Sequence, residues 1–102
     1  MSTDSAILVA RRFVELVKKQ IPVSQAYLFG SYAKNRAEEV SDIDIYIVSP
    51  VFGKSYWDEE SLLRRLSLKV DDRIEPVAFN PEDLEDKYNQ LAFEIKKYGV
   101  QI

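Results

Sequence analysis

Apolar residues recur with a helical period over the first twenty positions of the chain. A stripe at spacings of three and four predicts an amphipathic helix over residues 3–20. The stripe consists of Ala6, Val9, Ala10, Phe13, Val14 and Val17. Ser2 or Thr3 can cap its first turn. Pro22 lacks an amide hydrogen and disfavours helical angles in the residue before it, so the helix should end there.

The pattern changes to a two-residue alternation at residues 41–48. Three isoleucines fall on one face of this segment, and Asp42, Asp44 and Tyr46 fall on the other. A strand with one buried face has this period, because successive side chains point to opposite sides of a sheet. We therefore expect a strand whose isoleucine face lies in the core and whose aspartate face is free for chemistry.

Shorter patterns complete the secondary structure. Residues 25–29 and 73–79 are predicted strands, and Pro76 places the second at a sheet edge or a bulge because proline cannot donate a ladder hydrogen bond. Further helices are predicted at residues 31–39, 58–70, 80–87 and 91–98. Gly99 should close the last helix as a left-handed cap, and the last three residues could add a short strand.

Helices and strands thus alternate along the whole chain. This order indicates an α/β or α+β class, with a small mixed sheet of three to four strands and helices packed against it. A chain of 102 residues is expected to form a single domain, residues 1–102, around one modest core.

Composition narrows the chemistry that the chain can perform. It has no cysteine and no histidine, which excludes disulfides, thiolate zinc sites and imidazole acid–base chemistry. With 46% hydrophobic and 30% charged residues, no membrane-length apolar run and no secretory signal at its start, it is expected to be cytoplasmic and to bind no membrane. A net charge of −3 argues against broad nucleic-acid binding, although divalent cations would let an acidic protein bind a small polyphosphate.

Asp42 and Asp44 are the first candidate site residues. On one strand face their β-carbons lie about 6–7 Å apart, so each should raise the proton affinity of the other unless a cation compensates. Mg²⁺ suits this role, because it takes one or two carboxylates and completes its shell with water and substrate phosphate. With a third carboxylate, two ions roughly 3.5–4 Å apart could serve in-line displacement at phosphorus. The alternative is a solvated strand face.

Glu75 is the favoured third carboxylate, because an acid in the otherwise apolar third strand needs a reason. Alternation also puts Glu75 on the same face as Arg73, so an ion pair between the two competes with a metal role. Asp71 and Asp72 are rival third carboxylates, although at the strand entry they are more typical of a turn.

Gly30 and Ser31 follow a predicted strand and precede a predicted helix, where backbone amides and the helix dipole favour a phosphate. Glycine lets the backbone approach the ligand, and the serine hydroxyl can donate a hydrogen bond to a phosphate oxygen. Lys34 and Arg36 add positive charge nearby. Gly-Ser after a strand is common in ordinary turns, so this interpretation depends on its conjunction with the aspartate pair.

Together these residues resemble the signature of a known family. Gly30-Ser31, ten intervening residues and Asp42-Ile43-Asp44 are similar to the motif of the DNA polymerase beta-like nucleotidyltransferase superfamily, and the small size points to its minimal nucleotidyltransferase branch. The resemblance extends through the Arg-Ile-Glu-Pro segment, residues 73–76, to the end of the chain. The family usually has arginine and then glycine where this chain has Lys34 and Asn35, a departure that keeps the positive charge.

The resemblance implies a nucleotidyltransferase fold and Mg²⁺-dependent transfer of a nucleotide, with ATP as the donor and AMP as the expected group. Asp42, Asp44 and Glu75 would then be the catalytic residues and the ligands of two Mg²⁺ ions. The nucleotide phosphates would lie against Gly30, Ser31 and Lys34.

The resemblance also implies a protein partner. Minimal nucleotidyltransferases often pair with a separately encoded HEPN-domain protein, and several are antitoxins that transfer AMP to it. We therefore expect a HEPN-type partner in trans and no direct nucleic-acid binding, with self-association left open. One alternative is a nucleotidyltransferase-like antitoxin that neutralises its partner by contact. Another is an α/β domain whose aspartates are only solvated.

Overall fold

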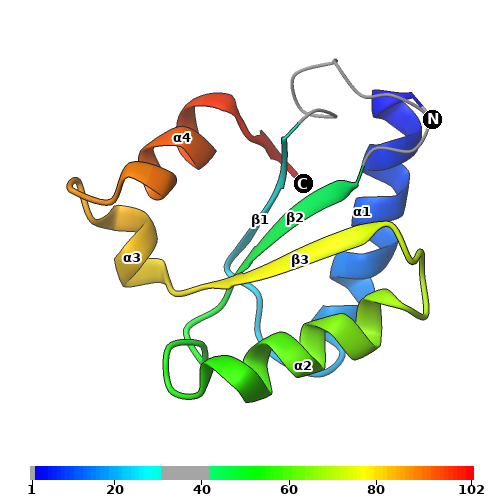
Figure 1. Ribbon diagram of the computed structural model, residues 1–102, viewed down its shortest axis with the longest axis horizontal. Helices are drawn as coiled ribbons and strands as arrows, with labels where there is room; N and C mark the ends of the chain where they lie inside the picture. The colour runs from blue at the N-terminus through cyan, green and yellow to red at the C-terminus, as the bar shows by residue number, and fades with distance from the viewer. Residues whose placement is uncertain (1, 31–41) are drawn as a thin grey trace.

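The computed structural model describes residues 2–30 and 42–102 (Figure 1). Within these ranges the elements are α1 (Thr3–Lys18), β1 (Gln25–Phe29), β2 (Ile43–Val48), α2 (Tyr56–Ser67), β3 (Ile74–Phe79), α3 (Pro81–Glu85), α4 (Gln90–Tyr98) and β4 (Val100–Gln101). The predicted helix at residues 31–39 lies outside the described residues. Across the described ranges, each helix is too short or too polar to span a membrane.

The strands of the described chain form one mixed sheet in the order β3-β2-β1-β4. β1 pairs antiparallel with β2 and with β4, whereas β2 pairs parallel with β3. A parallel pair needs a crossover, and α2 supplies it between β2 and β3 (Figure 1). The predicted class, a small mixed sheet with helices packed against it, is confirmed.

The isoleucine face of β2 is the centre of the larger core. Ile43, Ile45 and Ile47 are fully buried, as the alternation predicts. α1 packs Phe13 against them and α2 packs Leu63, so both helices cover the same face of the sheet. The predicted stripe of α1 therefore builds the core, and the polar side of β2 is directed away from it.

The opposite face of the sheet carries a smaller core beneath α3 and α4. Tyr27, Val48 and Phe79 pack there against Leu84 and Ile95. Asp44 lies on this same face, closer to the start of β2, and is only half-buried. β2 thus separates the main core from the polar side chains that were predicted to form a site.

β3 is an edge strand, which is one of the two arrangements that Pro76 predicts. Its pairing with β2 leaves the backbone groups of Ile74, Pro76 and Ala78 on the free edge. Arg64 of α2 donates to the Ile74 carbonyl at 3.0 Å, and Glu60 accepts from the Ala78 amide at 3.1 Å. Two polar side chains of α2 thereby cover the edge, and proline stands where no amide hydrogen is needed.

Both ends of α2 differ from the prediction. The helix begins at Tyr56 rather than Asp58 and ends at Ser67 rather than residue 70. Glu59 accounts for the early start, because its carboxylate accepts hydrogen bonds of 2.9 to 3.1 Å from the backbone amides of Gly53, Lys54 and Ser55. The hydrogen bond from the Gly53 amide is the largest cause of a lowered pKa at Glu59.

Gly99 ends α4 in a different way from the predicted left-handed cap. Its φ is −73°, in the region that any residue adopts. Glycine is needed there for space instead, because a β-carbon would overlap the carbonyl oxygen of Ile95, to which the Gly99 amide donates at 2.8 Å. The predicted end of this helix at Gly99 is confirmed, but the predicted left-handed conformation of Gly99 is wrong.

The turn before β3 contains an ion pair whose contribution to the stability of the fold depends on pH. Asp71 accepts from Arg73 through the backbone amide at 2.9 Å and through the guanidinium at 3.0 and 2.7 Å. The side-chain hydrogen bond from Arg73 is the main reason why the pKa of Asp71 is lowered. A lowered folded-state pKa contributes stability above the unfolded-state value, and that contribution is lost as pH falls through the folded-state pKa.

We predict that Asp71→Asn lowers the free energy of unfolding at pH 7 by about 1 kcal/mol. The difference from the native chain should shrink as pH drops below about 4. Urea denaturation across this range measures both effects. Asp72→Asn, at the exposed neighbouring position, is the matched control and should change stability little. An equal loss in both variants, or a loss independent of pH, would contradict the assignment.

Candidate active site

Asp44 lies at the centre of the candidate site, because strand pairing gives it a neighbour on each side. It is in register with Phe29 of β1 and with Glu75 of β3. Partners in register share a sheet face, so the Asp44 and Glu75 carboxylates project from the same side. The structure therefore brings together two of the predicted carboxylates that lie 31 residues apart in the sequence.

The carboxylates at this edge repel one another. Burial raises the pKa of Asp44, and the nearby charges of Asp42 and Glu75 raise it further. The predicted rise in proton affinity is thus present at Asp44, with Glu75 as an additional source. A cation bound among these oxygens would relieve the repulsion.

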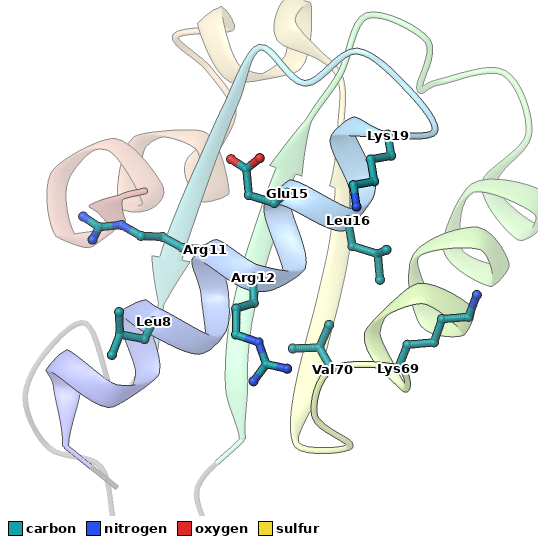
Figure 2. A pocket seen from close by; sticks show the side chains of 8 residues that line it. All are labelled: Leu8, Arg11, Arg12, Glu15, Leu16, Lys19, Lys69 and Val70. Atoms are coloured by element: carbon teal, nitrogen blue, oxygen red, sulfur yellow. The ribbon is translucent and has the colours of Figure 1, made fainter.

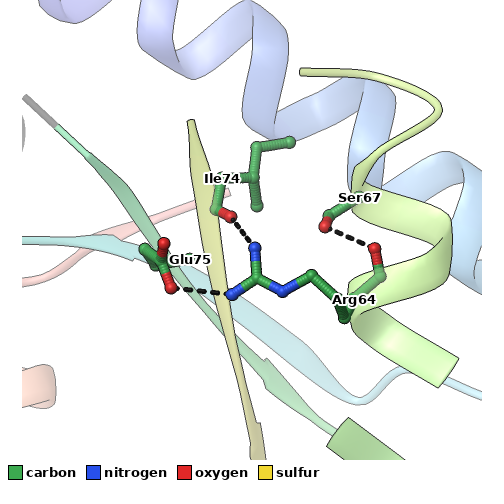
Figure 3. Close-up of polar contacts among 4 residues, drawn as sticks. All are labelled: Arg64, Ser67, Ile74 and Glu75. Atoms are coloured by element: carbon green, nitrogen blue, oxygen red, sulfur yellow. Dashed lines mark hydrogen bonds and ion pairs between the residues drawn. The ribbon is translucent and has the colours of Figure 1, made fainter. Parts of the chain in front are cut away.

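Glu75 has a cationic partner, but it is not Arg73. Arg64 of α2 reaches the free edge of β3, where its Nη2 donates to Glu75 Oε2 at 2.8 Å and its Nη1 donates to the Ile74 carbonyl (Figure 3). An arginine therefore pairs with Glu75 as predicted, but this arginine is Arg64 and not Arg73. Arg73 pairs with Asp71 instead, because that carboxylate lies in the same short turn.

A further hydrogen bond steadies the helix turn that carries Arg64. The hydroxyl of Ser67 donates to the Arg64 carbonyl at 2.8 Å (Figure 3). Both side chains of the Arg64–Glu75 pair are a little over two-fifths exposed, so water reaches the contact. Arg64 is therefore anchored through its backbone, yet its guanidinium remains able to exchange partners.

Within residues 2–30 and 42–102, no group of three acidic side chains is arranged as a ready-made metal site. The donor set still fits a hard divalent cation, since it consists of carboxylate oxygens and carries excess negative charge at Asp44. Asp42 and Asp44 would hold such an ion, and Glu75 would join them by leaving or sharing Arg64. Substrate phosphate oxygens would complete the shell.

Gly30 turns the chain away from β1 directly against Asp44. Its φ is +77°, a conformation that side chains rarely adopt. A β-carbon at this position would also overlap Oδ2 of Asp44. Glycine is thus required both by the backbone and by the close approach to the carboxylate. The predicted phosphate-binding residues Ser31 and Lys34 lie outside the described residues and stay predictions.

The wall of the site towards α4 is aromatic. Tyr46 lies edge-to-face between Phe29 and Phe79, with ring centroids 5.6 and 6.2 Å away. Burial raises the pKa of Tyr46, and the charges of Asp44 and Glu94 add to the rise. Its hydroxyl therefore stays neutral beside the carboxylates at neutral pH, and its ring packs between the two phenylalanines.

Comparison with known proteins identifies the family. The family model for a nucleotidyltransferase domain matches residues 10–100. The chain belongs to the nucleotidyltransferase family. A curated protein of Methanocaldococcus jannaschii, named provisionally as a protein adenylyltransferase, is 35% identical over 85 residues, covering 79% of this chain and 87% of that protein. The resemblance seen in the sequence is confirmed, and the chain is a nucleotidyltransferase.

Solved structures share the fold. A structure from Sulfolobus solfataricus, also named provisionally as a nucleotidyltransferase, has a TM-score of 0.72 and 21% identity, covering 97% of this chain and 80% of that one. A toxin–antitoxin structure with AMP-PNP has a TM-score of 0.59 and 24% identity, covering 90% and 70%. The expected nucleotidyltransferase fold is confirmed.

Among the described residues, Arg64 makes polar contacts in this nucleotidyltransferase site that the sequence pattern did not predict. The only available signal was its position on the polar side of a helix that had to pack beside the third strand. That signal gives the face of the helix but not the partner, which depends on how α2 lies along β3.

The close approach of Gly30 to Asp44 can be tested by a double-mutant cycle. Gly30→Ala should cost about 2 kcal/mol or more of unfolding free energy, through the positive φ and the overlap with Oδ2. Gly53→Ala is the matched control, because Gly53 has a φ of +104° and no overlapping neighbour. It should cost about 1 kcal/mol.

The excess cost at Gly30 should disappear when the carboxylate is removed. In an Asp44→Ala background, Gly30→Ala is expected to cost no more than Gly53→Ala does. Urea denaturation gives the four free energies of the cycle. If Gly30→Ala costs the same with and without the carboxylate, the two groups are not in contact.

Proposed function

We propose that this nucleotidyltransferase transfers a nucleoside monophosphate, AMP from ATP, onto a hydroxyl of a protein partner. The observation that carries the proposal is the placement of Asp44 between Gly30 and Glu75, which gathers carboxylates beside a glycine turn on one sheet face. In the reaction the acceptor oxygen forms a bond to the α-phosphorus and the bond from that phosphorus to the bridging oxygen breaks. Pyrophosphate leaves, and the acceptor proton passes to a carboxylate or to water.

The residues of the site divide this work. Asp42 and Asp44 would hold one or two Mg²⁺ ions, with Glu75 as the third ligand. When bound, Mg²⁺ would neutralise phosphate charge and align the reacting groups. Gly30 leaves the space that the Asp44 carboxylate occupies. Gly30, Ser31 and Lys34 are proposed to bind the phosphates.

ATP and a protein acceptor are supported by relatives rather than by geometry. The archaeal relative is named as a protein adenylyltransferase, and the toxin–antitoxin neighbour holds AMP-PNP. The family resemblance adds a HEPN-domain protein as the expected partner, with the chain acting as its antitoxin.

Transfer is tested with ATP labelled at different phosphates. Incubation with Mg²⁺ and the partner should label the partner from α-labelled ATP and leave it unlabelled from γ-labelled ATP. The double variant Asp42→Asn, Asp44→Asn should lower the rate by about 100-fold or more, because the charge that holds the cations is lost. The double variant Asp4→Asn, Asp83→Asn removes the same charge at exposed positions and should keep the rate.

The rival proposal, neutralisation by contact alone, predicts a different outcome for the same variants. Calorimetry measures complex formation with the partner, and a growth assay measures neutralisation. If both survive loss of Asp42 and Asp44, contact suffices and transfer is not the function. If neutralisation requires ATP and the aspartates while complex formation does not, the transfer proposal stands.

Arg64 gives a test of the third carboxylate. Removing a positive charge 2.8 Å from Glu75 should strengthen the binding of a divalent cation, so Arg64→Gln is predicted to raise Mg²⁺ affinity about five-fold. It should also lower the unfolding free energy in metal-free buffer by up to about 1 kcal/mol. Calorimetry and urea denaturation measure these effects.

Arg65→Gln is the matched control for this test. Arg65 is the next residue of α2 and is exposed, so its loss should change neither quantity by a comparable amount. Equal Mg²⁺ affinity in the Arg64 variant and the native chain would mean that Glu75 does not bind the cation.

A further inference from the structure

A groove lies beside α1, on the side of the sheet that α1 and α2 cover and away from the face that carries Asp44. It has a volume of about 680 Å³ and runs along the outer side of α1 to the segment that follows α2. Figure 2 shows its lining side chains, which come from α1 and from residues 69–70. The groove is therefore separate from the candidate active site.

The floor of the groove is apolar. Leu8 is 61% exposed, and Leu16 and Val70 are half-buried beside it. Leu8 and Leu16 are eight residues apart, which puts them on one side of α1 two turns from each other. Arg12 lies midway between the two leucines on α1, so its methylene stem joins Leu8, Leu16 and Val70 in an apolar surface that a partner can cover.

The rim of the groove is cationic. Arg11, Arg12 and Lys19 extend from α1, and Lys69 extends from the opposite side. Among the described residues, Glu15 is the one carboxylate that lines the groove, and Asp71 lies close enough to Arg12 for the two charges to interact. Glu15 already lies 3.9 Å from Lys18. Among the residues that the structure describes, no ion pair engages Arg11, Lys19 or Lys69. The groove is thus locally basic on a chain whose net charge is −3.

We infer that this groove docks an acidic amphipathic helix of a partner protein. The distance along α1 from Leu8 to Lys19 corresponds to about three turns, or roughly 16 Å, which fits one helix of similar length. Its apolar stripe would cover the floor, and carboxylates on both sides of that stripe would face the rim cations. Charge complementarity selects the acidic helix, and the apolar floor selects a helix over a polyanion.

Other occupants fit the groove less well. A second copy that placed its own α1 here would bring Arg11, Arg12 and Lys19 against the same three cations. Nucleic acid would use the cations and leave the exposed leucine uncovered. The inference does not rest on nucleotidyl transfer, because docking here involves none of the carboxylates of the site.

A selection experiment tests the chemistry of the occupant. The probe is a library of single-helix peptides of about 18 residues, with a fixed leucine stripe and randomised flanking positions, selected against the full chain. Selected peptides should carry Glu and Asp at the flanks and bind with a Kd of about 50 µM or tighter by fluorescence anisotropy. Amide chemical-shift changes should map to Leu8, Leu16 and Val70.

Substitutions in the groove then test whether the selected peptides bind there. Leu8→Asp and the double variant Arg11→Glu, Lys19→Glu should each weaken the selected peptides at least ten-fold while circular dichroism stays unchanged. Phe93→Asp and Arg65→Glu are matched controls, because they alter an exposed apolar residue and an exposed cation elsewhere. Both should bind within two-fold of the native chain.

Several outcomes would overturn the inference. These are no selected binder tighter than about 1 mM, enrichment of basic flanks, shifts that map to another face, self-association through α1, or RNA binding that the Leu8 variant retains. The Asp42→Asn, Asp44→Asn variant should bind the peptides normally. Nucleotidyl transfer and helix docking are therefore tested by separate measurements, and either proposal can fail without the other.

Discussion

The register of β2 against its two neighbours is the constraint on which the site depends. A slip of one residue would turn Asp44 into the core and bring buried isoleucines to the surface, because side chains alternate with a period of two. Three fully buried isoleucines therefore fix the register as firmly as the backbone hydrogen bonds do. The same pairing sets Asp44 beside Glu75, so one strand specifies the core with one face and the site with the other.

That register places the negative charges of Asp44 and Glu75 next to each other, and Arg64 neutralises the charge of Glu75. One guanidinium neutralises Glu75 and also caps the Ile74 carbonyl on the free edge of β3. Protection of the edge and balance of charge are thus combined in a single side chain. A divalent cation at the proposed site would compete with Arg64 for the same carboxylate.

The sequence could predict what depends on neighbours along the chain. The aspartate pair follows from alternation, and the edge position follows from Pro76. The partner of Glu75 could not be predicted in this way, because alternation compares residues of one strand and pointed to Arg73. In the structure Arg73 pairs with Asp71 within a short turn, and the packing of α2 brings Arg64 into an ion pair with Glu75. Glu75 was predicted because an acid in the otherwise apolar third strand needs a reason, and the strand register then placed it beside Asp44.

The groove and the site lie on opposite faces, yet one partner can reach both. The molecule measures at most 35 Å across, and an extended chain spans about 3.3–3.6 Å per residue. Because the linking chain must pass round the molecule, a partner that docks a helix along α1 needs about fifteen further extended residues to present a hydroxyl near Asp44. Docking on a face remote from the chemistry would raise the local concentration of that hydroxyl without occupying the nucleotide's place. A domain of this size can in this way separate the selection of its acceptor from the transfer itself.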